Sequence, residues 1–170
     1  QRAGVAAGID CRLLLVPRHV ERAPDVLKLR KAQELPWYQR STRDIVPENL
    51  AIHLADTTGE LAHLSQTADL AFIGKSLTPN EGGQTPIEAA GLGVPVLMGS
   101  KMNNFKDVAK SLILAGAALT VEHADELRSE VLKLAKDQAS RVSMQQAGLE
   151  WHKRNSGSSQ RIAEQILKNL

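Results

Sequence analysis

The segment at residues 74–88, GKSLTPNEGGQTPIE, combines residue types that suit a phosphate and a sugar. Gly82 and Gly83 lack Cβ atoms, so backbone N–H groups there can approach a phosphate closely. Thr85 and Glu88 stand at the N-cap and third positions of a predicted helix. Because the start of a helix offers free N–H donors and the positive end of its dipole, this segment predicts an anion-binding turn.

Glu88 has two compatible roles at this helix start. In one role its carboxylate only completes a capping box with Thr85. In the other role it faces a cleft and accepts hydrogen bonds from ribose hydroxyls, for which a carboxylate has enough lone pairs. The glycine spacing matches neither the P-loop nor the dinucleotide-binding fingerprint, so spacing alone leaves both roles open.

Two further polar stretches follow apolar runs directly. Arg18 can make a bidentate contact with a phosphate or a carboxylate, and the alternative is an exposed arginine paired with Glu21. Thr57 or Thr58 can cap a helix that starts in the second stretch. The 5 histidines are scattered along the chain, so the sequence predicts no metal site and no cofactor.

Short apolar runs, each closed by a turn residue, alternate with helical patterns and must position these stretches. The runs predict strands at residues 11–16, 50–54, 70–73, 94–98 and 117–121, and the patterns predict helices at residues 24–33, 59–66, 86–91, 105–114 and 125–136. The remainder to residue 170 is helical with a break near 155–159, whereas the polar, proline-containing residues 35–48 predict a loop.

Strands that are apolar on both faces and alternate with helices indicate a single α/β domain. Its expected core is a doubly wound, Rossmann-like parallel sheet with right-handed crossovers. In such a sheet, ligands bind outside the carboxyl ends of the strands. The polar stretches described above begin at those ends, so they are the expected binding site.

The bulk composition narrows the function class. The chain has 170 residues and a net charge of +2, with basic residues spread along it, which argues against nucleic-acid binding. Aromatic residues are only 3%, so no base-stacking surface is expected. Cys11 is the only cysteine, and no apolar run reaches the roughly 18 residues of a membrane span. The chain opens with Gln1 in the middle of a pattern, which indicates a soluble fragment of a longer protein.

Segments at four places carry a resemblance to a known family. Residues 15–22 read LVPRHVER, residues 56–61 read DTTGEL, residues 74–88 form the segment described first, and residues 93–107 include GVPVLMG and NFKD. The first three are similar to the PRHPER, DTxGEL and GGSL…GGHNPLE motifs of the bacterial Kdo (3-deoxy-D-manno-octulosonic acid) transferases. The match runs in order over roughly residues 11–135. The chain thus resembles the C-terminal half of a GT-B glycosyltransferase, which implies that residues 1–170 form its nucleotide-sugar-binding domain.

The resemblance implies a site for CMP-Kdo, the donor nucleotide sugar. The phosphate would lie near Arg18 and the helix start at Thr85, the ribose near Glu88, and the base near backbone groups of residues 58–60. Carried over by position, the substrate-binding residues are Pro17, Arg18, Thr58, Gly59, Glu60, Gly82, Gly83, Gln84, Thr85, Pro86, Ile87 and Glu88.

For the intact enzyme the resemblance implies transfer of Kdo to a lipid A precursor in lipopolysaccharide biosynthesis. The expected location is the cytoplasmic face of the bacterial inner membrane. The family's catalytic carboxylate, acceptor site and membrane anchor lie in its N-terminal domain. No catalytic residue is therefore expected within residues 1–170, and the isolated fragment is expected to be inactive.

The chain departs from the family at two places. Lys75 stands where the family has its second glycine, and Gln84-Thr85 replaces its His-Asn pair. Glutamine keeps hydrogen-bonding ability without a titratable proton, and threonine can still cap a helix. Two alternatives stay open: a GT-B domain that uses a UDP-sugar donor, and a non-catalytic nucleotide-binding module.

Overall fold

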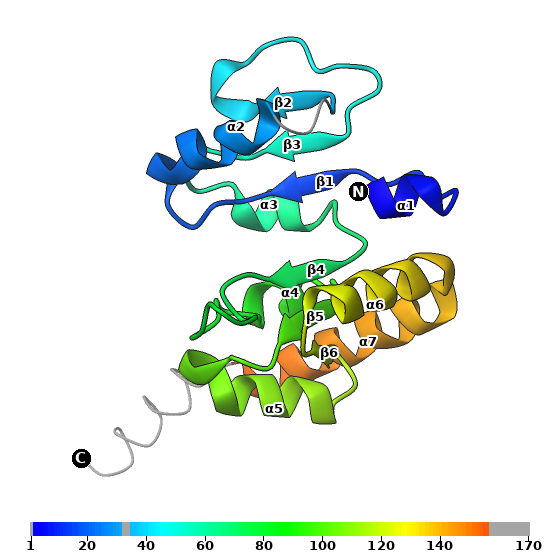
Figure 1. The fold of residues 1–170 in the computed structure, drawn as a ribbon. Coiled ribbons are helices and arrows are strands. Elements are labelled where there is room, and N and C mark those ends of the chain that lie inside the picture. The colour runs from blue at the N-terminus through cyan, green and yellow to red at the C-terminus, as the bar shows by residue number, and fades with distance from the viewer. Residues whose placement is uncertain (1, 32–34, 157–170) are drawn as a thin grey trace, which may run out of the picture. The chain divides into compact units, whose positions relative to one another are not determined.

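The structure is a computed structural model that describes residues 2–31 and 35–156. The chain divides into two compact units, Gln1–Ala68 and Asp69–Leu170. Each unit contains its own three-stranded sheet, and all of the strand pairs are parallel (Figure 1). The expected α/β class with parallel strands is therefore confirmed, whereas the one sheet expected from the sequence is in fact two three-stranded sheets.

The first unit is built on the sheet order β1-β3-β2. Leu13 of β1 and Trp37 of β2 both lie opposite Ile52 of the central strand β3. Its strands are β1 (Leu13–Leu15), β2 (Trp37–Gln39) and β3 (Ile52–Leu54), its helices are α1 (Arg2–Ala6), α2 (Ala23–Lys31) and α3 (Leu61–Ser65), and its 3-10 turns are η1 (Val20–Arg22) and η2 (Arg40–Thr42).

The core of the first unit lies between its sheet and α2. Trp37, Ile52 and Leu54 are buried together with Ala23 at the start of α2, and Val26 and Leu27 of the same helix pack against them. Side chains alternate between the two faces of a strand, so His53 points to the other face. There its ring lies 5.0 Å from the ring of Tyr38.

Strand β2 corrects the expectation of a loop at residues 35–48. The side chain of Trp37 is only 8% exposed and anchors the strand in the core. Pro36 has no N–H, but its carbonyl accepts hydrogen bonds from Ala51 and Ile52 at 3.0 and 3.1 Å. Proline is tolerated at the start of an edge strand for this reason. A strand of three residues with one buried side chain leaves no periodic pattern to read.

The second unit is built on the sheet order β4-β5-β6, with Val96 of β5 opposite both Ala71 and Ala118. The central strand β5 is buried along its whole length. Its strands are β4 (Ala71–Ile73), β5 (Val96–Gly99) and β6 (Ala118–Val121), its helices are α4 (Ile87–Gly91), α5 (Lys106–Leu114), α6 (Ala124–Lys136) and α7 (Gln138–Asn155), and its 3-10 turn is η3 (Asn103–Phe105).

Helices cover both faces of the second sheet. Leu97 packs with Leu134 of α6 and Met144 of α7. The neighbouring Met98 and its cross-strand partner Thr120 face the other way, toward residues of α5. Figure 1 shows α6 and α7 side by side, and the end of α7 reaches α5, where Trp151 Nε1 donates to Ser111 Oγ at 2.7 Å. The second unit therefore has the doubly wound arrangement that the sequence predicts.

The strands predicted from apolar runs are all present, with ends that differ by one or two residues. Helix α1 was not expected, and the predicted helical stretch after residue 136 is α7 up to Asn155. The break predicted near 155–159 and the helix beyond it lie mostly outside the described residues. Across the described ranges, every helix is too short or too polar to cross a membrane.

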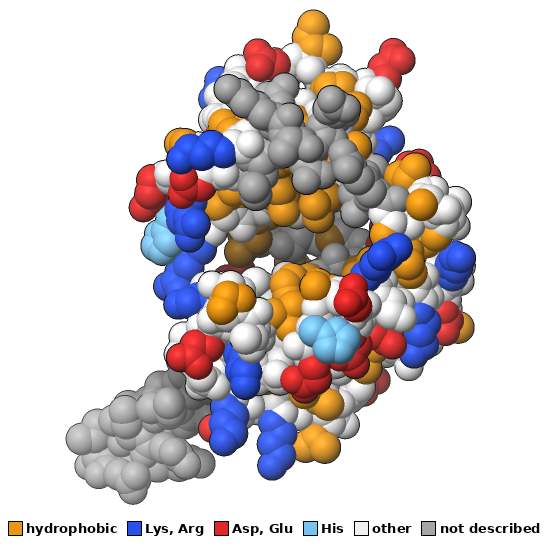
Figure 2. All heavy atoms as spheres, in the orientation of Figure 1, with side chains coloured by type: hydrophobic (Ala, Val, Ile, Leu, Met, Phe, Trp, Pro, Cys, Tyr) orange, Lys and Arg blue, Asp and Glu red, His pale blue; other side chains and the backbone are white. Residues whose placement is uncertain are grey.

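Charged side chains of both signs mix on the surface. The chain has 21 Lys and Arg residues against 19 Asp and Glu residues. Over the face drawn in Figure 2, blue basic side chains are interspersed with red acidic ones.

Gly148 lets α7 approach α4 closely. A Cβ atom built on Gly148 would lie 2.8 Å from the carbonyl oxygen of Ala90, a backbone atom of α4. Gly148 is itself buried. The absence of a side chain therefore sets the distance between the two helices, which interiors packed at crystal-like density cannot easily change.

The substitution Gly148→Ala tests this contact. Alanine favours a helix over glycine by about 1 kcal/mol, but overpacking costs typically about 1–3 kcal/mol. We expect a net loss of about 1 kcal/mol in the free energy of unfolding, measured by urea denaturation. Ser143→Ala, at an exposed position of the same helix, should be neutral or slightly stabilising. A Gly148→Ala variant more stable than the wild type would contradict the close-packing argument.

Candidate functional site

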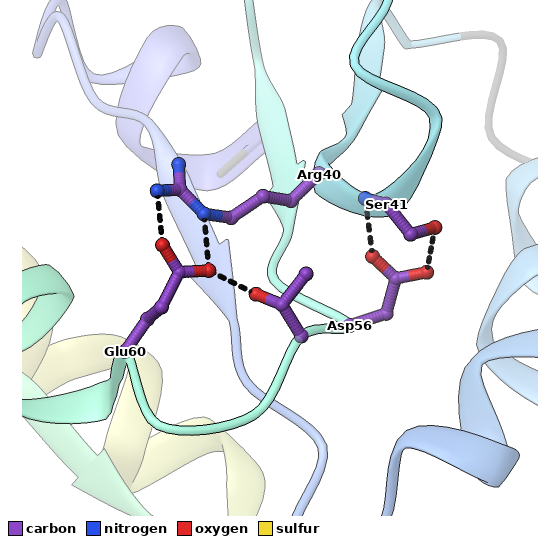
Figure 3. Close-up of polar contacts among 5 residues, drawn as sticks. Arg40, Ser41, Asp56 and Glu60 are labelled. Carbon is purple, nitrogen blue, oxygen red and sulfur yellow. Dashed lines mark hydrogen bonds and ion pairs between the residues drawn. The ribbon is translucent and has the colours of Figure 1, made fainter.

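The turn after β3 is held by an arginine from the segment after β2. Arg40 Nε donates to Glu60 Oε2 at 2.7 Å, and Arg40 Nη2 donates to Glu60 Oε1 at 2.5 Å. The hydroxyl of Thr57 donates to the same carboxylate. Figure 3 shows the guanidinium and the carboxylate aligned in a two-point contact. A bidentate pair of this kind fixes orientation as well as distance.

Asp56 makes a second set of contacts between the same two segments. Its carboxylate accepts hydrogen bonds from the Ser41 N–H at 2.9 Å and from the Ser41 hydroxyl at 2.6 Å (Figure 3). Gln39 Nε2 donates to the same carboxylate at 2.7 Å. The carboxyl ends of β2 and β3 are thus tied together through side chains.

These contacts shift the titration of three groups. Hydrogen bonds from Arg40 and Thr57 lower the pKa of Glu60 from 4.5 to about 2. Burial would raise the pKa of Asp56, but hydrogen bonds from Ser41 and its neighbour Gln39 outweigh burial and lower it. Burial, followed by the charge of Arg40, lowers the pKa of His53. Both carboxylates are therefore ionised at neutral pH and act as anchors for the turn.

Glu60 was expected to contact the base through its backbone, and in the structure its side chain binds Arg40. The backbone of Thr58 and Gly59 remains on the exposed part of the turn. The expectation that Thr57 or Thr58 caps α3 is wrong: Glu60 is the N-cap residue and its side chain makes no cap hydrogen bond. Arg40 was missed because it falls in the segment that the sequence predicted to be a loop.

Arg18 follows the carboxyl end of β1 together with the half-buried Pro17. Its guanidinium is exposed and has no ion pair or hydrogen bond to any residue that the structure describes. The alternative pairing with Glu21 is wrong, because Glu21 Oε1 lies 3.7 Å from His19 Nδ1. Arg18 is therefore available to an external anion.

The loop after β4 is pinned by the buried Ser76. Its hydroxyl donates to the Ile73 carbonyl at 2.6 Å and accepts from the Gly99 N–H at 2.8 Å. Its carbonyl accepts from the Lys101 N–H at 2.9 Å. Ser76 thus joins the carboxyl ends of β4 and β5, the two strands from which the predicted phosphate segment and the NFKD segment continue.

Gly82 and Gly83 correct the expectation that their N–H groups face a phosphate. The Gly82 N–H donates to the Lys101 carbonyl at 2.9 Å, and the Gly83 N–H donates to the Lys75 carbonyl at 2.8 Å. Both residues adopt positive φ, at 105° and 70°. The glycines therefore shape the loop rather than supply anion donors.

The helix start at residues 84–88 differs in detail from the predicted capping box. Helix α4 begins at Ile87, and the Ile87 N–H donates to Thr85 Oγ1 at 3.4 Å. Glu88 is exposed and makes no hydrogen bond or ion pair within residues 2–31 and 35–156. The capping-box role of Glu88 is therefore wrong, and its carboxylate is available to a ligand. Pro86 is buried beneath this turn, while Gln84 is half-buried.

A polar hollow of about 580 Å³ adjoins this loop in the second unit. It is lined by Lys75, Pro79, Asn80, Glu81, Gly82, Asn103 and Asn104. Among the described residues, no group of three or more His, Cys, Asp or Glu side chains is placed to hold a metal ion.

Comparison with known proteins decides the family. No protein-family model matches the chain. The 3-deoxy-D-manno-octulosonic acid transferase of Haemophilus influenzae is 35% identical over 164 residues, which is 96% of this chain and 38% of that protein. The enzyme of the same name from Bordetella pertussis is 34% identical over 155 residues, 91% of this chain and 36% of that protein. Over the region it spans, the chain belongs to the Kdo transferase family.

The chain spans little more than a third of the length of these Kdo transferases. Among solved structures, the C-terminal CMP-Kdo binding domain of WaaA from Acinetobacter baumannii aligns with a TM-score of 0.80 and 23% identity, covering 88% of this chain and 79% of that chain. WaaG, a glycosyltransferase involved in lipopolysaccharide biosynthesis, aligns with a TM-score of 0.51 and 16% identity over 91% of this chain and 46% of that one. The expected Rossmann-like GT-B fold is thereby confirmed.

The ion pair between Arg40 and Glu60 gives a titration that can be measured. In Arg40→Met the carboxylate loses its strongest donor, so an NMR titration of the Glu60 carboxyl should show its pKa rising from about 2 toward 4.5. The ionised Glu60 carboxylate stabilises the folded state fully at pH values above 4.5. This contribution is lost as the pH falls from 4.5 toward 2, because the carboxylate becomes protonated. The variant should therefore lose less stability than the wild type over that acid range.

Arg43→Met is the matched control, because Arg43 is an exposed arginine close in sequence to Arg40. It should leave the Glu60 titration unchanged. If Glu60 titrates near 4.5 in the wild-type chain, or moves equally in both variants, the ion pair is not the cause.

Proposed function

We propose that this chain is the CMP-Kdo-binding C-terminal domain of a Kdo transferase. The whole enzyme would transfer Kdo from CMP-Kdo to a lipid A precursor in lipopolysaccharide biosynthesis. The observation that carries this proposal is the position of the family-like motifs. Each lies at the carboxyl end of a parallel strand of its own unit, where ligands bind in open α/β sheets.

The relatives support the choice of donor. The Haemophilus influenzae and Bordetella pertussis proteins are named as Kdo transferases. The Acinetobacter baumannii domain, whose fold this chain shares, is described as a CMP-Kdo binding domain. We carry the donor over to this chain on those grounds together with the motifs.

The donor phosphate is assigned to Arg18 and to the segment of Gln84 and Thr85. An arginine without a protein partner offers two parallel N–H donors to phosphate oxygens. Since the N–H groups of Gly82 and Gly83 donate to the carbonyls of Lys101 and Lys75, the phosphate depends more strongly on Arg18 than the glycine pair suggests.

The ribose and the base are assigned to the remaining exposed groups. The free carboxylate of Glu88 accepts hydrogen bonds from ribose hydroxyls, and Pro86 and Ile87 shape the surface beside it. The backbone of Thr58 and Gly59 contacts the base, in a turn that Arg40 and Glu60 hold in place. Glu60 thus serves the site by positioning the turn.

The chemistry of transfer divides between this domain and the rest of the enzyme. A carboxylate outside this chain removes the proton of the acceptor hydroxyl, which then attacks the anomeric carbon of Kdo with inversion. The bond between the anomeric carbon and the phosphate oxygen breaks, and CMP leaves with the electron pair. Arg18 stabilises the charge that develops on the departing phosphate. Because the acceptor is a lipid, we place the intact enzyme at the cytoplasmic face of the inner membrane.

Nucleotide titration of the 170-residue chain tests this assignment. We expect CMP to bind more tightly than UDP, measured by isothermal titration calorimetry. Arg18→Met should weaken CMP binding about tenfold, because a charge-assisted contact to the phosphate is lost.

Arg12→Met is the control for this experiment. Arg12 is exposed and precedes β1, whereas Arg18 follows it, so the two arginines lie at opposite ends of the same strand. Its removal changes the net charge equally and should leave the affinity unchanged. Tighter binding of UDP than of CMP would overturn the donor assignment. An equal loss of CMP affinity in both variants would mean that Arg18 acts only through its contribution to the net charge.

A further inference from the structure

Lys75 adopts a backbone conformation that lysine disfavours. Its φ is 59°, and Arg43, with φ of 55°, is the one other non-glycine residue with positive φ in the part of the chain that the structure describes. In this left-handed region the Cβ atom crowds the following carbonyl. A glycine, which the Kdo transferases resembled above have at this place, would adopt the conformation without that cost. Strain of this kind concentrates at functional sites, so Lys75 is a candidate for a specific role.

The Lys75 side chain lines the polar hollow of about 580 Å³. Three carboxamides, from Asn80, Asn103 and Asn104, lie along the same hollow. A carboxamide both donates and accepts hydrogen bonds, as a sugar hydroxyl does. The volume falls within the range of small-molecule sites. The lining therefore suits a hydroxyl-rich ligand better than an apolar one.

Two loops of the second unit build this hollow and hold its shape. Gly82 accepts from the Asn104 N–H at 3.0 Å, and its own N–H donates to Lys101 at 2.9 Å. A Cβ atom on Gly82 would lie 2.8 Å from Asn104 Nδ2, so only a glycine leaves that carboxamide in place. Asn103 Nδ2 donates to Glu81 Oε2 at 3.3 Å across the same two loops.

The charges in the hollow leave Lys75 without a partner. Glu81, the one acidic residue of the lining, is engaged by Asn103. Lys75 Nζ makes no ion pair or hydrogen bond with any of the described residues. Lys75 is therefore the charged residue of this lining without a partner, and its exposed ammonium is the group to which an anion on the ligand would bind.

The hollow is also joined to the segment assigned to the phosphate. The Lys75 carbonyl accepts the Gly83 N–H at 2.8 Å, and Gly83 lies two residues before Thr85. The hollow and the segment assigned to the phosphate therefore belong to the same loop. CMP-Kdo has a second anion besides its phosphate, the carboxylate of the sugar acid.

We propose that this hollow holds the sugar acid of the donor, with Lys75 paired to its carboxylate and the carboxamides bonded to its hydroxyls. This inference rests on the proposed function and adds to it one charged contact to the sugar acid. Lys75 makes a contact that the glycine of the resembled Kdo transferases lacks, which gives the strained backbone a role.

Binding of CMP and of freshly prepared CMP-Kdo to the 170-residue chain tests this proposal. Lys75→Met keeps the side-chain length and the strained backbone but removes the charge. It should weaken CMP-Kdo binding about fivefold, the upper range for a solvent-accessible ion pair, and change CMP binding less than twofold. Lys75→Arg should restore most of the CMP-Kdo affinity.

The strain provides an independent readout. Lys75→Gly and Arg43→Gly each relieve a positive φ, so each should raise the melting temperature by about 2 °C. Only Lys75→Gly should weaken CMP-Kdo binding. Arg43→Gly thus controls for both the loss of positive charge and the gain in stability.

Each outcome decides a different point. Equal weakening of CMP and CMP-Kdo in Lys75→Met would place Lys75 at the phosphate and overturn the carboxylate assignment. Unchanged affinity for both ligands would overturn any role of Lys75 while leaving the proposed function intact. A wild-type chain that binds neither ligand would overturn the proposed function, and this inference with it.

Discussion

Parallel strands that end at one edge of a sheet decide where the polar residues of this chain can act. The central strands β3 and β5 are each paired on both sides in parallel register. Within each unit, the segments that leave neighbouring strands are therefore brought together at the carboxyl edge. Residues far apart in the sequence, such as Arg40 and Glu60 or Ser76 and Gly99, meet there. The binding surface is a consequence of strand direction before it is a consequence of any motif.

Polar residues at these edges divide into those that hold loops and those that remain unpaired. Side-chain hydrogen bonds to nearby segments occupy Asp56, Glu60 and Ser76. Arg18 and Glu88 are exposed and without partners among the residues described. A site needs both kinds, because an unpaired side chain is useful only when its backbone is fixed. The family-like motifs contain both kinds next to each other, so the residue type alone does not reveal which role a residue has.

The sequence predicted what depends on local pattern and missed what depends on long-range contacts. Apolar runs gave β5 and β6 because strands buried on both faces are continuous in the sequence. The pattern could not reveal β2, whose one buried residue, Trp37, is recognisable only from the core around it. Nor could it show that the Gly82 N–H is taken by Lys101, since that hydrogen bond joins two loops. The predicted site residues do follow strand ends, while their hydrogen-bond partners had to come from the structure.

The side chains proposed for the phosphate also determine how its binding depends on pH. The proposed phosphate ligands are an arginine, which stays charged, and the uncharged Gln84 and Thr85. None of these side chains gains or loses a proton near neutral pH, whereas a histidine at position 84 would. Any change in CMP affinity between pH 5 and 7 must then come largely from the ligand, whose phosphomonoester loses its second proton near pH 6. CMP-Kdo is a phosphodiester without that proton, so its binding should vary little over the same range. Replacing histidine by glutamine thus leaves the pH dependence of the site to the nucleotide itself.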